Sequence, residues 1–204
     1  GMFDPHGWTG PVNVVAKLFM KRVRLQKWNE ELPEDVRESW NEFRGRLPVL
    51  ENLKIPRHAV INNPVEVTLH GFSDASEAAY GAVFYMRSSD AVGNVQVSLL
   101  CSKSRVSPPK LQTIARLELC AAVLMSRLFA MFVSACDSRF GEVVLWCDSM
   151  ITLHWIATEP SKLSVFVGHR VSAVQELTIA EGCKWRHIRS EDNPADKLSR
   201  GLQP

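Results

Sequence analysis

Apolar residues recur at helical spacing in two stretches near the N-terminus. Residues 11–27 carry an apolar face and a basic face, and residues 32–47 begin with Pro33 in a first-turn position and continue with an apolar stripe. Both patterns predict amphipathic helices. The first apolar face is Val14, Val15, Leu18, Phe19 and Val23, the basic face is Lys17, Lys21, Arg22, Arg24 and Lys27, and the second stripe is Val36, Trp40, Phe43 and Leu47.

A connector rich in proline and asparagine, residues 54–66, interrupts the helical pattern. Such residues punctuate domains, so we predict a boundary near residue 60, with a helical unit over 1–60 and a second domain over 61–204. We expect the helical unit to fold onto the second domain and to shield apolar surface with its stripe of Trp40 and Phe43.

The period changes from helical to alternating after residue 64. Residues 65–74, 78–88 and 94–104 read as three strands with short links, which predicts an antiparallel meander. Residues 111–135 read as a long apolar helix and 142–149 as a buried fourth strand. Helices over 149–160 and 164–180, a fifth strand over 183–190 and a last helix over 193–201, with Pro194 in its first turn, complete the order. This order, βββαβααβα, implies an α/β domain with a mixed five-stranded sheet.

Composition excludes several classes of protein. Apolar residues make up 46% and charged residues 23% of the 204-residue chain, as in ordinary globular proteins. No run of 18 apolar residues predicts a membrane span, and the N-terminus lacks the pattern of a secretory signal. Five cysteines without metal-ligand spacing favour reduced thiols, so we expect an intracellular, cytoplasmic protein with no membrane partner.

Charge does not by itself indicate a nucleic-acid-binding domain. Residues 61–204 carry 14 lysines and arginines against 14 acids, so their net charge is zero. A neutral domain is a poor candidate for non-specific binding to nucleic acid. Divalent metal ions bound by some of these acids would make the net charge of the domain positive.

Four acids occupy positions in predicted strands and helices where a carboxylate is unusual. Asp74 follows a strand among small residues, Glu118 shares the inward face of the apolar helix, Asp148 ends a buried strand, and Asp196 opens the last helix. Each has a structural alternative: a turn acid for Asp74, a buried ion pair for Glu118, and helix-start roles for the others. For Asp148 the alternative is an N-cap, which Ser149 could also supply.

Taken together, the four acids predict a metal site. Oxygen ligands without histidine or cysteine spacing suit Mg²⁺ or Mn²⁺. Two such ions about 4 Å apart clamp the attacking and leaving oxygens of a phosphodiester. Hydrolysis of a phosphodiester is therefore the reaction that this set of residues indicates.

The same four positions carry a family likeness. Asp74 in SDAS, Glu118 in RLEL, Asp148 in WCDS and Asp196 in NPADKLSRG resemble the four-carboxylate set of type I ribonuclease H, and the element order matches that fold. The amino-acid sequence around these acids is most similar to the ribonuclease H region of BEL/Pao long-terminal-repeat retrotransposon polyproteins. The blocks that carry this resemblance are FDPHGWTGPV, LHGFSDASEAAYGAVFYMR, CSKSRVSPPKLQTIARLELCAA and WRHIRSEDNPADKLSRG.

The resemblance implies a function for each part of the chain. Residues 3–60 would be the thumb- or connection-like tail of a reverse transcriptase, and residues 64–204 would cleave the RNA strand of RNA/DNA hybrids in retrotransposon particles. Asp74 would bridge two Mg²⁺ ions, for which Mn²⁺ can substitute. Glu118 and Asp148 would hold the ion on the leaving-group side, and Asp196 the ion that activates water. The partners would be the hybrid and the upstream reverse transcriptase.

Two features depart from the pattern of cellular ribonucleases H. Those enzymes carry a mobile histidine just before the fourth acid, whereas this sequence has Glu191 near that place and His187 within the fifth strand. Some relatives also have a basic helical protrusion, for which residues 159–163 leave no room.

The alternative function is a catalytically silent, connection-type module that binds nucleic acid or braces the polymerase. The candidate substrate contacts are Ser76, Lys103, Arg105, Arg116, Ser149 and Asn193, although we favour the cap role for Ser149 and surface roles remain open for the cations.

Overall fold

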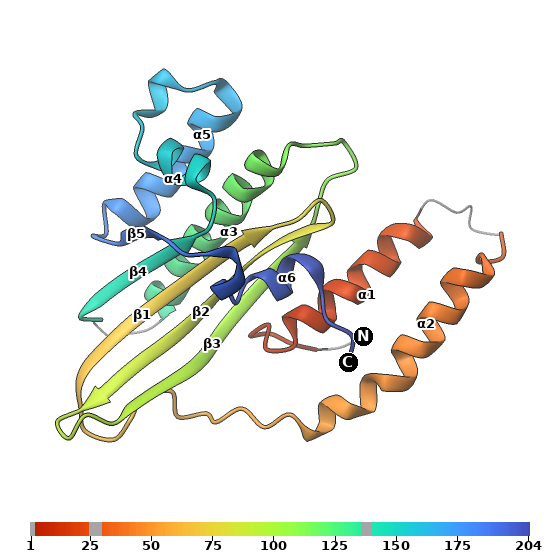
Figure 1. Cartoon of the computed structure of the whole chain (residues 1–204), viewed down its shortest axis with the longest axis horizontal. Helices are drawn as coiled ribbons and strands as arrows, with labels where there is room; N and C mark the ends of the chain where they lie inside the picture. The colour runs from red at the N-terminus through yellow and green to blue at the C-terminus, as the bar shows by residue number, and fades with distance from the viewer. Residues whose placement is uncertain (1–2, 25–29, 136–139) are drawn as a thin grey trace.

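The computed structural model describes residues 3–24, 30–135 and 140–204. A five-stranded sheet in the order β3-β2-β1-β4-β5 forms its centre (Figure 1). Strands β1 (Pro64–Ala75), β2 (Ala79–Asp90) and β3 (Val95–Val106) form an antiparallel meander. Strands β4 (Glu142–Cys147) and β5 (Lys184–His187) extend it in parallel on the other side of β1. The predicted α/β fold with a mixed sheet is confirmed.

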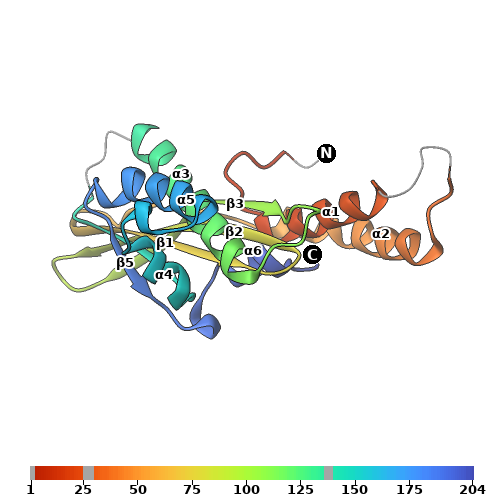
Figure 2. The same cartoon turned by 90° about the horizontal axis from the view of Figure 1, so that it is seen from above.

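Helices cover both faces of the sheet (Figure 2). One face carries α3 (Ile114–Ala135), with α4 (Met150–Ile156) and α5 (Val165–Val174) packed beside it, and the other carries the short α6 (Asp196–Arg200). Alternation along β1 sends Leu69 into the core under α3 and Phe72 toward α6. The main core beneath α3 consists of Leu69, Ala82, Phe84, Met125, Leu128, Phe129, Leu145 and Cys183.

Helix α3 has the length and apolar composition of a membrane span. However, 56% of its most apolar window is buried inside the protein. Its apolar surface therefore already has a partner in the sheet, which identifies it as a core helix. Cys147 and Cys183 are buried thiols, whereas Cys101 and Cys120 are only half-buried, and Cys136 lies outside the described residues.

The C-terminal region differs from the prediction. A 3₁₀ turn (Ser190–Asp192) precedes Pro194, and α6 begins only at Asp196. The prediction that this helix begins at residue 193, with Pro194 in its first turn, is therefore wrong. Asn193 is buried instead, and its side-chain amide donates to the carbonyl of Ser73 while its Oδ1 accepts from the amide of Ala195. These bonds tie the chain to β1, so a helix cannot begin there. Likewise, α5 gives way to a π-helical turn (Gln175–Ile179).

The N-terminal helices α1 (Gly10–Val23) and α2 (Glu34–Arg46), followed by a 3₁₀ turn (Leu47–Asn52), form a small core of their own. Trp40 and Phe43 pack against Phe19 of α1. The expectation that this stripe shields the sheet is therefore wrong. The division of the chain at residue 60 remains a prediction.

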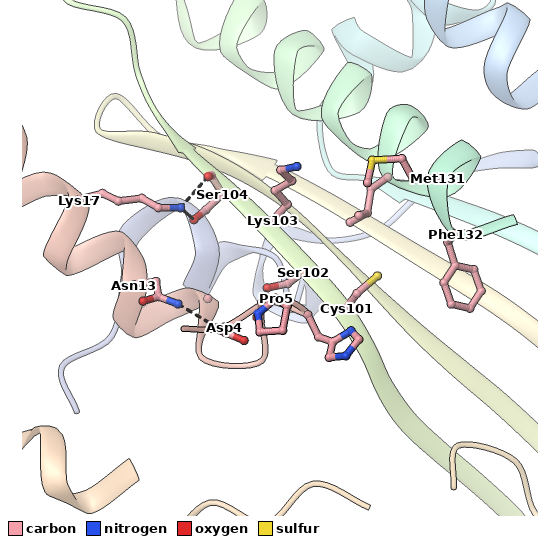
Figure 3. A pocket seen from close by; sticks show the side chains of 14 residues that line it. Asp4, Pro5, Asn13, Lys17, Cys101, Ser102, Lys103, Ser104, Met131 and Phe132 are labelled. Atoms are coloured by element: carbon pink, nitrogen blue, oxygen red, sulfur yellow. Dashed lines mark hydrogen bonds between the residues drawn. The ribbon is translucent and has the colours of Figure 1, made fainter. Parts of the chain in front are cut away.

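Contact with the sheet comes from residues 4–21 instead. The amide of Ser102 donates to the carbonyl of His6, at 2.8 Å, and Trp8 Nε1 donates to the carbonyl of Leu100, also at 2.8 Å. Lys17 Nζ donates to the carbonyl and hydroxyl oxygens of Ser104 (Figure 3). The N-terminal segment thereby covers the free edge of β3, which would otherwise expose unpaired backbone groups.

The basic face predicted on the first helix has a structural role. Lys17 and Lys21 both donate to carbonyls at the end of β3, and Arg22 forms an ion pair with Asp35 of α2. Burial and the neighbouring Lys103 lower the pKa of Lys17. Lys17 and Lys21 therefore dock α1 on β3, whereas Arg22 and Arg24 are exposed on the helix, and Lys27 lies outside the described residues.

Candidate active site

Asp74 lies at the carboxyl end of β1, opposite Gly81 of β2. Its residue is only 5% exposed, and its Oδ2 is buried without a hydrogen-bond partner among the described residues. Burial raises the pKa of Asp74 to about 6, with further increases from the charges of Asp148 and Asp196. The Ser199 hydroxyl and Arg200 oppose this shift. A carboxylate at this position therefore lacks the positive partner that its charge requires.

Glu118 extends from the second turn of α3 toward the end of β1. Its Oε1 accepts a hydrogen bond from the amide of Ala75, at 3.2 Å, and its Oε2 is buried and unpartnered within the described ranges. Burial, followed by the charges of Asp74 and Asp148, raises the pKa of Glu118 to about 9. In the part of the chain that the structure describes, no lysine or arginine pairs with it. The alternative of a buried ion pair is therefore not realised.

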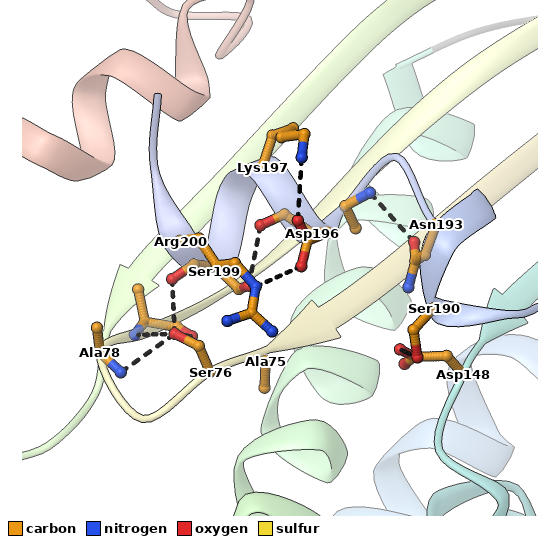
Figure 4. Close-up of polar contacts among 12 residues, drawn as sticks. Ala75, Ser76, Ala78, Asp148, Ser190, Asn193, Asp196, Lys197, Ser199 and Arg200 are labelled. Carbon is orange, nitrogen blue, oxygen red and sulfur yellow. Dashed lines mark hydrogen bonds and ion pairs between the residues drawn. The ribbon is translucent and has the colours of Figure 1, made fainter. Parts of the chain in front are cut away.

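Asp148 follows β4 directly. Its Oδ2 accepts a hydrogen bond from the Ser190 hydroxyl at 2.7 Å, and its Oδ1 is buried with no partner in the described chain (Figure 4). Ser149, not Asp148, caps α4, because its hydroxyl accepts from the amide of Thr152. The cap role favoured for Ser149 is confirmed, and it leaves the carboxylate of Asp148 available for another purpose.

Ligand atoms of Glu118, Cys147 and Asp148 lie within 4.8 Å of one another. Burial raises the pKa of the Cys147 thiol to about 12, and a sulfur ligand does not suit the hard cations that carboxylate oxygens bind. The donors at this end of the sheet are thus carboxylate oxygens, supplied by β1, α3 and the end of β4.

Asp196 lies at the rim of the cluster, at the start of α6. Its side chain is 24% exposed and forms ion pairs with Arg200, at 2.5 Å, and with Lys197, at 3.2 Å. Partial burial raises the pKa of Asp196, but the hydrogen bonds from Arg200 and Lys197 outweigh it and hold that pKa below its ordinary value. The structure therefore gathers two buried acids, Asp74 and Glu118, with the half-buried Asp148, and the fourth acid lies beside them and is ionised.

Two predicted substrate contacts instead position α6. Ser76 donates from its hydroxyl to the carbonyl of Ser199 at 2.7 Å and accepts from the amides of Ala78 and Ala79 (Figure 4). Asn193 binds the carbonyl of Ser73. Both polar groups are used inside the protein, where they fix Asp196 relative to Asp74.

Close packing at Gly81 also sets the position of α6. A Cβ on this glycine would lie 2.5 Å from Cβ of Leu198. We expect Gly81→Ala to lower the free energy of unfolding by about 1–3 kcal/mol, because α6 must move off the sheet. Urea denaturation measures the change.

Gly45→Ala is the matched control, since a Cβ there meets nothing within 4 Å on exposed α2. It is expected to stabilise the protein by about 0.5–1 kcal/mol. Equal effects of the two substitutions would contradict the packing argument.

The predicted cationic contacts remain on the surface. Lys103 and Arg105 are exposed on β3, and the guanidinium of Arg116 lies 4.8 Å from the centre of the Phe166 ring. Sequence reasoning missed Ser190, Lys197 and Arg200 as partners of the acids. The spacing of Asp196 and Arg200, four residues apart on one helix, was the available signal for the last pair.

The donor set fits divalent magnesium or manganese. Three buried oxygens, from Asp74, Glu118 and Asp148, have no hydrogen-bond partner within the described residues. The charge of Asp148 contributes to the raised pKa of both Asp74 and Glu118. A hard cation with oxygen ligands would satisfy those atoms and offset the repulsion.

Comparison with protein families is decisive. A family model described as "Pao retrotransposon-like RNaseH-like domain" matches residues 1–149. The chain belongs to this family. The matched range takes in Asp74, Glu118 and Asp148 of the Pao-type domain and ends before Asp196. No curated protein matches the sequence.

Solved structures of ribonucleases H are similar to this Pao-type domain at low identity. The N-terminal ribonuclease H domain of a Mycobacterium tuberculosis protein is 15% identical, with a TM-score of 0.44, over 66% of this chain and 91% of that one. Ribonuclease H1 of Halobacterium salinarum is 15% identical, with a TM-score of 0.40, over 66% and 94%. LC11 ribonuclease H1, solved in complex with an RNA/DNA hybrid, is 15% identical, with a TM-score of 0.44, over 65% and 93%.

Proposed function

We propose that this domain hydrolyses the RNA strand of RNA/DNA hybrids at its carboxylate cluster, as part of retrotransposon reverse transcription. The observation that carries the proposal is the set of three buried, unpartnered carboxylate oxygens at one end of the sheet. Membership of the Pao family supports it, since that family is defined by a retrotransposon ribonuclease H-like domain. The upstream reverse transcriptase would deliver the hybrid.

The cluster would hold two Mg²⁺ ions, or Mn²⁺ in their place, through Asp74, Glu118, Asp148 and Asp196, and the ions would supply an activated water and charge stabilisation at the phosphodiester. The protein's own contacts prepare these side chains. The amide of Ala75 fixes Glu118, and the hydroxyl of Ser190 fixes Asp148. Arg200 and Lys197 keep Asp196 ionised beside solvent, where a carboxylate can orient water or accept its proton.

Cleavage of a labelled RNA/DNA hybrid tests the proposal. With Mg²⁺ or Mn²⁺ the wild-type chain is expected to cut the RNA strand alone, and EDTA is expected to stop it. Asp74→Asn should reduce the rate by at least about 10²-fold, because the central metal ligand loses its charge. Glu77→Gln, an exposed acid on the adjoining turn, is the matched control and should keep the wild-type rate. Cutting that survives EDTA or Asp74→Asn would contradict the proposed site.

A silent module would behave differently. The ion pairs of Asp196 with Arg200 and Lys197 favour this alternative, because they occupy one of the four acids. Such a module would not cut the hybrid with either metal, although it folds, and its Mn²⁺ affinity would not change in Asp148→Asn. The enzyme is expected to lose Mn²⁺ affinity in that variant, measured by titration calorimetry.

A further inference from the structure

A basic groove lies along the outer surface of α3. It is a hollow of 280 Å³ between the end of β3, the middle of α3 and α5. Four basic side chains line it, one from β3, one from α3 and two from α5, and we call it the α3 groove. These side chains are Arg105, Arg127, His169 and Arg170, and the other lining residues are Tyr80, Cys120, Val123, Leu124 and Ala173.

The α3 groove has positive charge without compensation. Its lining contains no carboxylate among the described residues, and none of its three arginines forms an ion pair there. Some exposed arginines elsewhere do pair, as Arg37 does with Glu34 and Arg46 with Glu42. In a domain whose net charge is zero, the groove is therefore a local site for anions.

One aromatic ring orders the guanidinium groups at the α5 side. Arg170 lies 3.5 Å from the centre of the Phe166 ring and donates to the carbonyl of Phe166 at 3.0 Å. Arg116 approaches the same ring at 4.8 Å. Cation–π contacts of this kind restrict the side chains before a ligand arrives, which suits the planar donors of arginine to a phosphate.

The α3 groove begins next to the acids. Arg105 pairs in register with Tyr80, which pairs with Ala75, the residue after Asp74. Two strand spacings place the Cα atom of Arg105 roughly 10 Å from that of Ala75. Arg127 lies nine residues beyond Glu118 on α3, about 14 Å along the helix axis. The groove therefore leads away from the cluster over a length that several phosphates of one strand would span.

We infer that the α3 groove binds the sugar–phosphate backbone of nucleic acid outside the segment that is cleaved. Arg105, Arg127 and Arg170 contact successive phosphates, and His169 adds a hydrogen-bond donor. The role as an extension of the substrate site rests on the proposed function, whereas the binding itself does not. A phosphate backbone fits better than a folded partner because the lining holds three guanidiniums that have no ion-pair partner among the described residues.

Fluorescence anisotropy of a labelled RNA/DNA hybrid in EDTA, at several salt concentrations, tests the inference without cleavage. The double variant Arg127→Gln with Arg170→Gln is expected to weaken binding about tenfold at low salt. It should also reduce the slope of log K against log salt by about 2, since each lost phosphate contact contributes about 0.9. The matched control is Arg37→Gln with Arg46→Gln, two exposed arginines of α2, which should leave affinity and slope unchanged.

Four outcomes separate the possibilities. An unchanged affinity and slope in the double variant, with its melting temperature preserved, would overturn the inference. Competition by poly-glutamate as effective as that by nucleic acid of equal charge would also overturn it, in favour of an acidic protein partner. Arg127→Lys with Arg170→Lys should recover most of the salt slope, because the charge returns. Absence of cleavage by the wild type, together with the expected loss of affinity and salt slope in the double variant, would contradict the proposed function and leave this inference standing.

Discussion

Glu118→Gln is expected to stabilise the metal-free protein at alkaline pH while it removes cleavage of the hybrid. In the folded chain the pKa of Glu118 is raised to about 9 by burial and by Asp74 and Asp148, whereas an unfolded glutamate has a pKa near 4.5. Between these values the folded protein holds a proton that the unfolded chain releases. The free energy of unfolding therefore falls as pH rises, by up to about 1.4 kcal/mol per pH unit.

Glutamine cannot ionise, so the variant should lose most of this pH dependence. Asp74, whose pKa is raised to about 6, contributes a smaller decline of the same sign at lower pH, and that decline should persist in the variant. Thermal melts in EDTA between about pH 5 and pH 9 measure the difference. The wild-type melting temperature should fall across this range, and that of Glu118→Gln should fall much less.

The second part of this test measures how divalent metal ions change the melting temperature. Mg²⁺ or Mn²⁺ added near pH 8 should restore the melting temperature of the wild type, because cations that bind only the folded state stabilise it. The variant should gain much less. Glu176→Gln, an exposed acid on the π-helical turn, is the control and should follow the wild type. Parallel pH curves for wild type and Glu118→Gln would contradict the burial of this carboxyl at the cluster.

A chain that starts at residue 61 is expected to be much less stable than the full chain. It loses seven hydrogen bonds between residues 6–21 and the sheet or the C-terminus, two of which Lys17 donates to Ser104. At about 1 kcal/mol each, these contribute about 7 kcal/mol, which corresponds to a fall in melting temperature of roughly 15–30 °C. The donor–acceptor pairs are Ser102–His6, Trp8–Leu100, Ser102–Gly7, Lys17–Ser104, Lys21–Ser107 and Leu202–Pro11.

Removal of residues 1–60 should also loosen the packing of α6 on the sheet. Pro11 accepts from the amide of Leu202, and a Cβ on Gly201 would meet Cγ2 of Val15 at 2.8 Å, so α1 packs closely on the end of α6. Differential scanning calorimetry of the two chains measures the stability. Phe43→Ala in the full chain is the control, since it weakens the core between α1 and α2 but keeps residues 6–21 in place. An unchanged melting temperature in the shortened chain would show that the N-terminal contacts contribute nothing.

The order of helices and strands could be predicted because its signals are local. Alternation in β1 and helical periodicity in α3 are properties of neighbouring residues, and each constrains the backbone over a few turns or strand residues. The same holds for Ser149, whose cap depends on an amide three residues away. The four acids could be selected for a similar reason, since each stands out against its immediate sequence.

Contacts between distant parts of the chain could not be predicted in this way. Helix α6 starts at Asp196 because Asn193 binds Ser73, 120 residues away, and Ser76 binds Ser199 across 123 residues. The stripe on α2 has the composition of a sheet-covering face, yet it packs on Phe19. Periodicity identifies the apolar face of a helix, but it does not identify the apolar surface against which that face packs.

The sequence by itself therefore determined the α/β order, the acids that a metal site would use and the likeness to retrotransposon ribonucleases H. Tertiary structure decided that Asp74, Glu118 and Asp148 meet with unpartnered oxygens while Asp196 is paired, that residues 4–21 cover the edge of β3, and that arginines from β3, α3 and α5 line one groove. The physical reason is that burial and charge interactions depend on distances in space, and these are fixed only when the elements pack together.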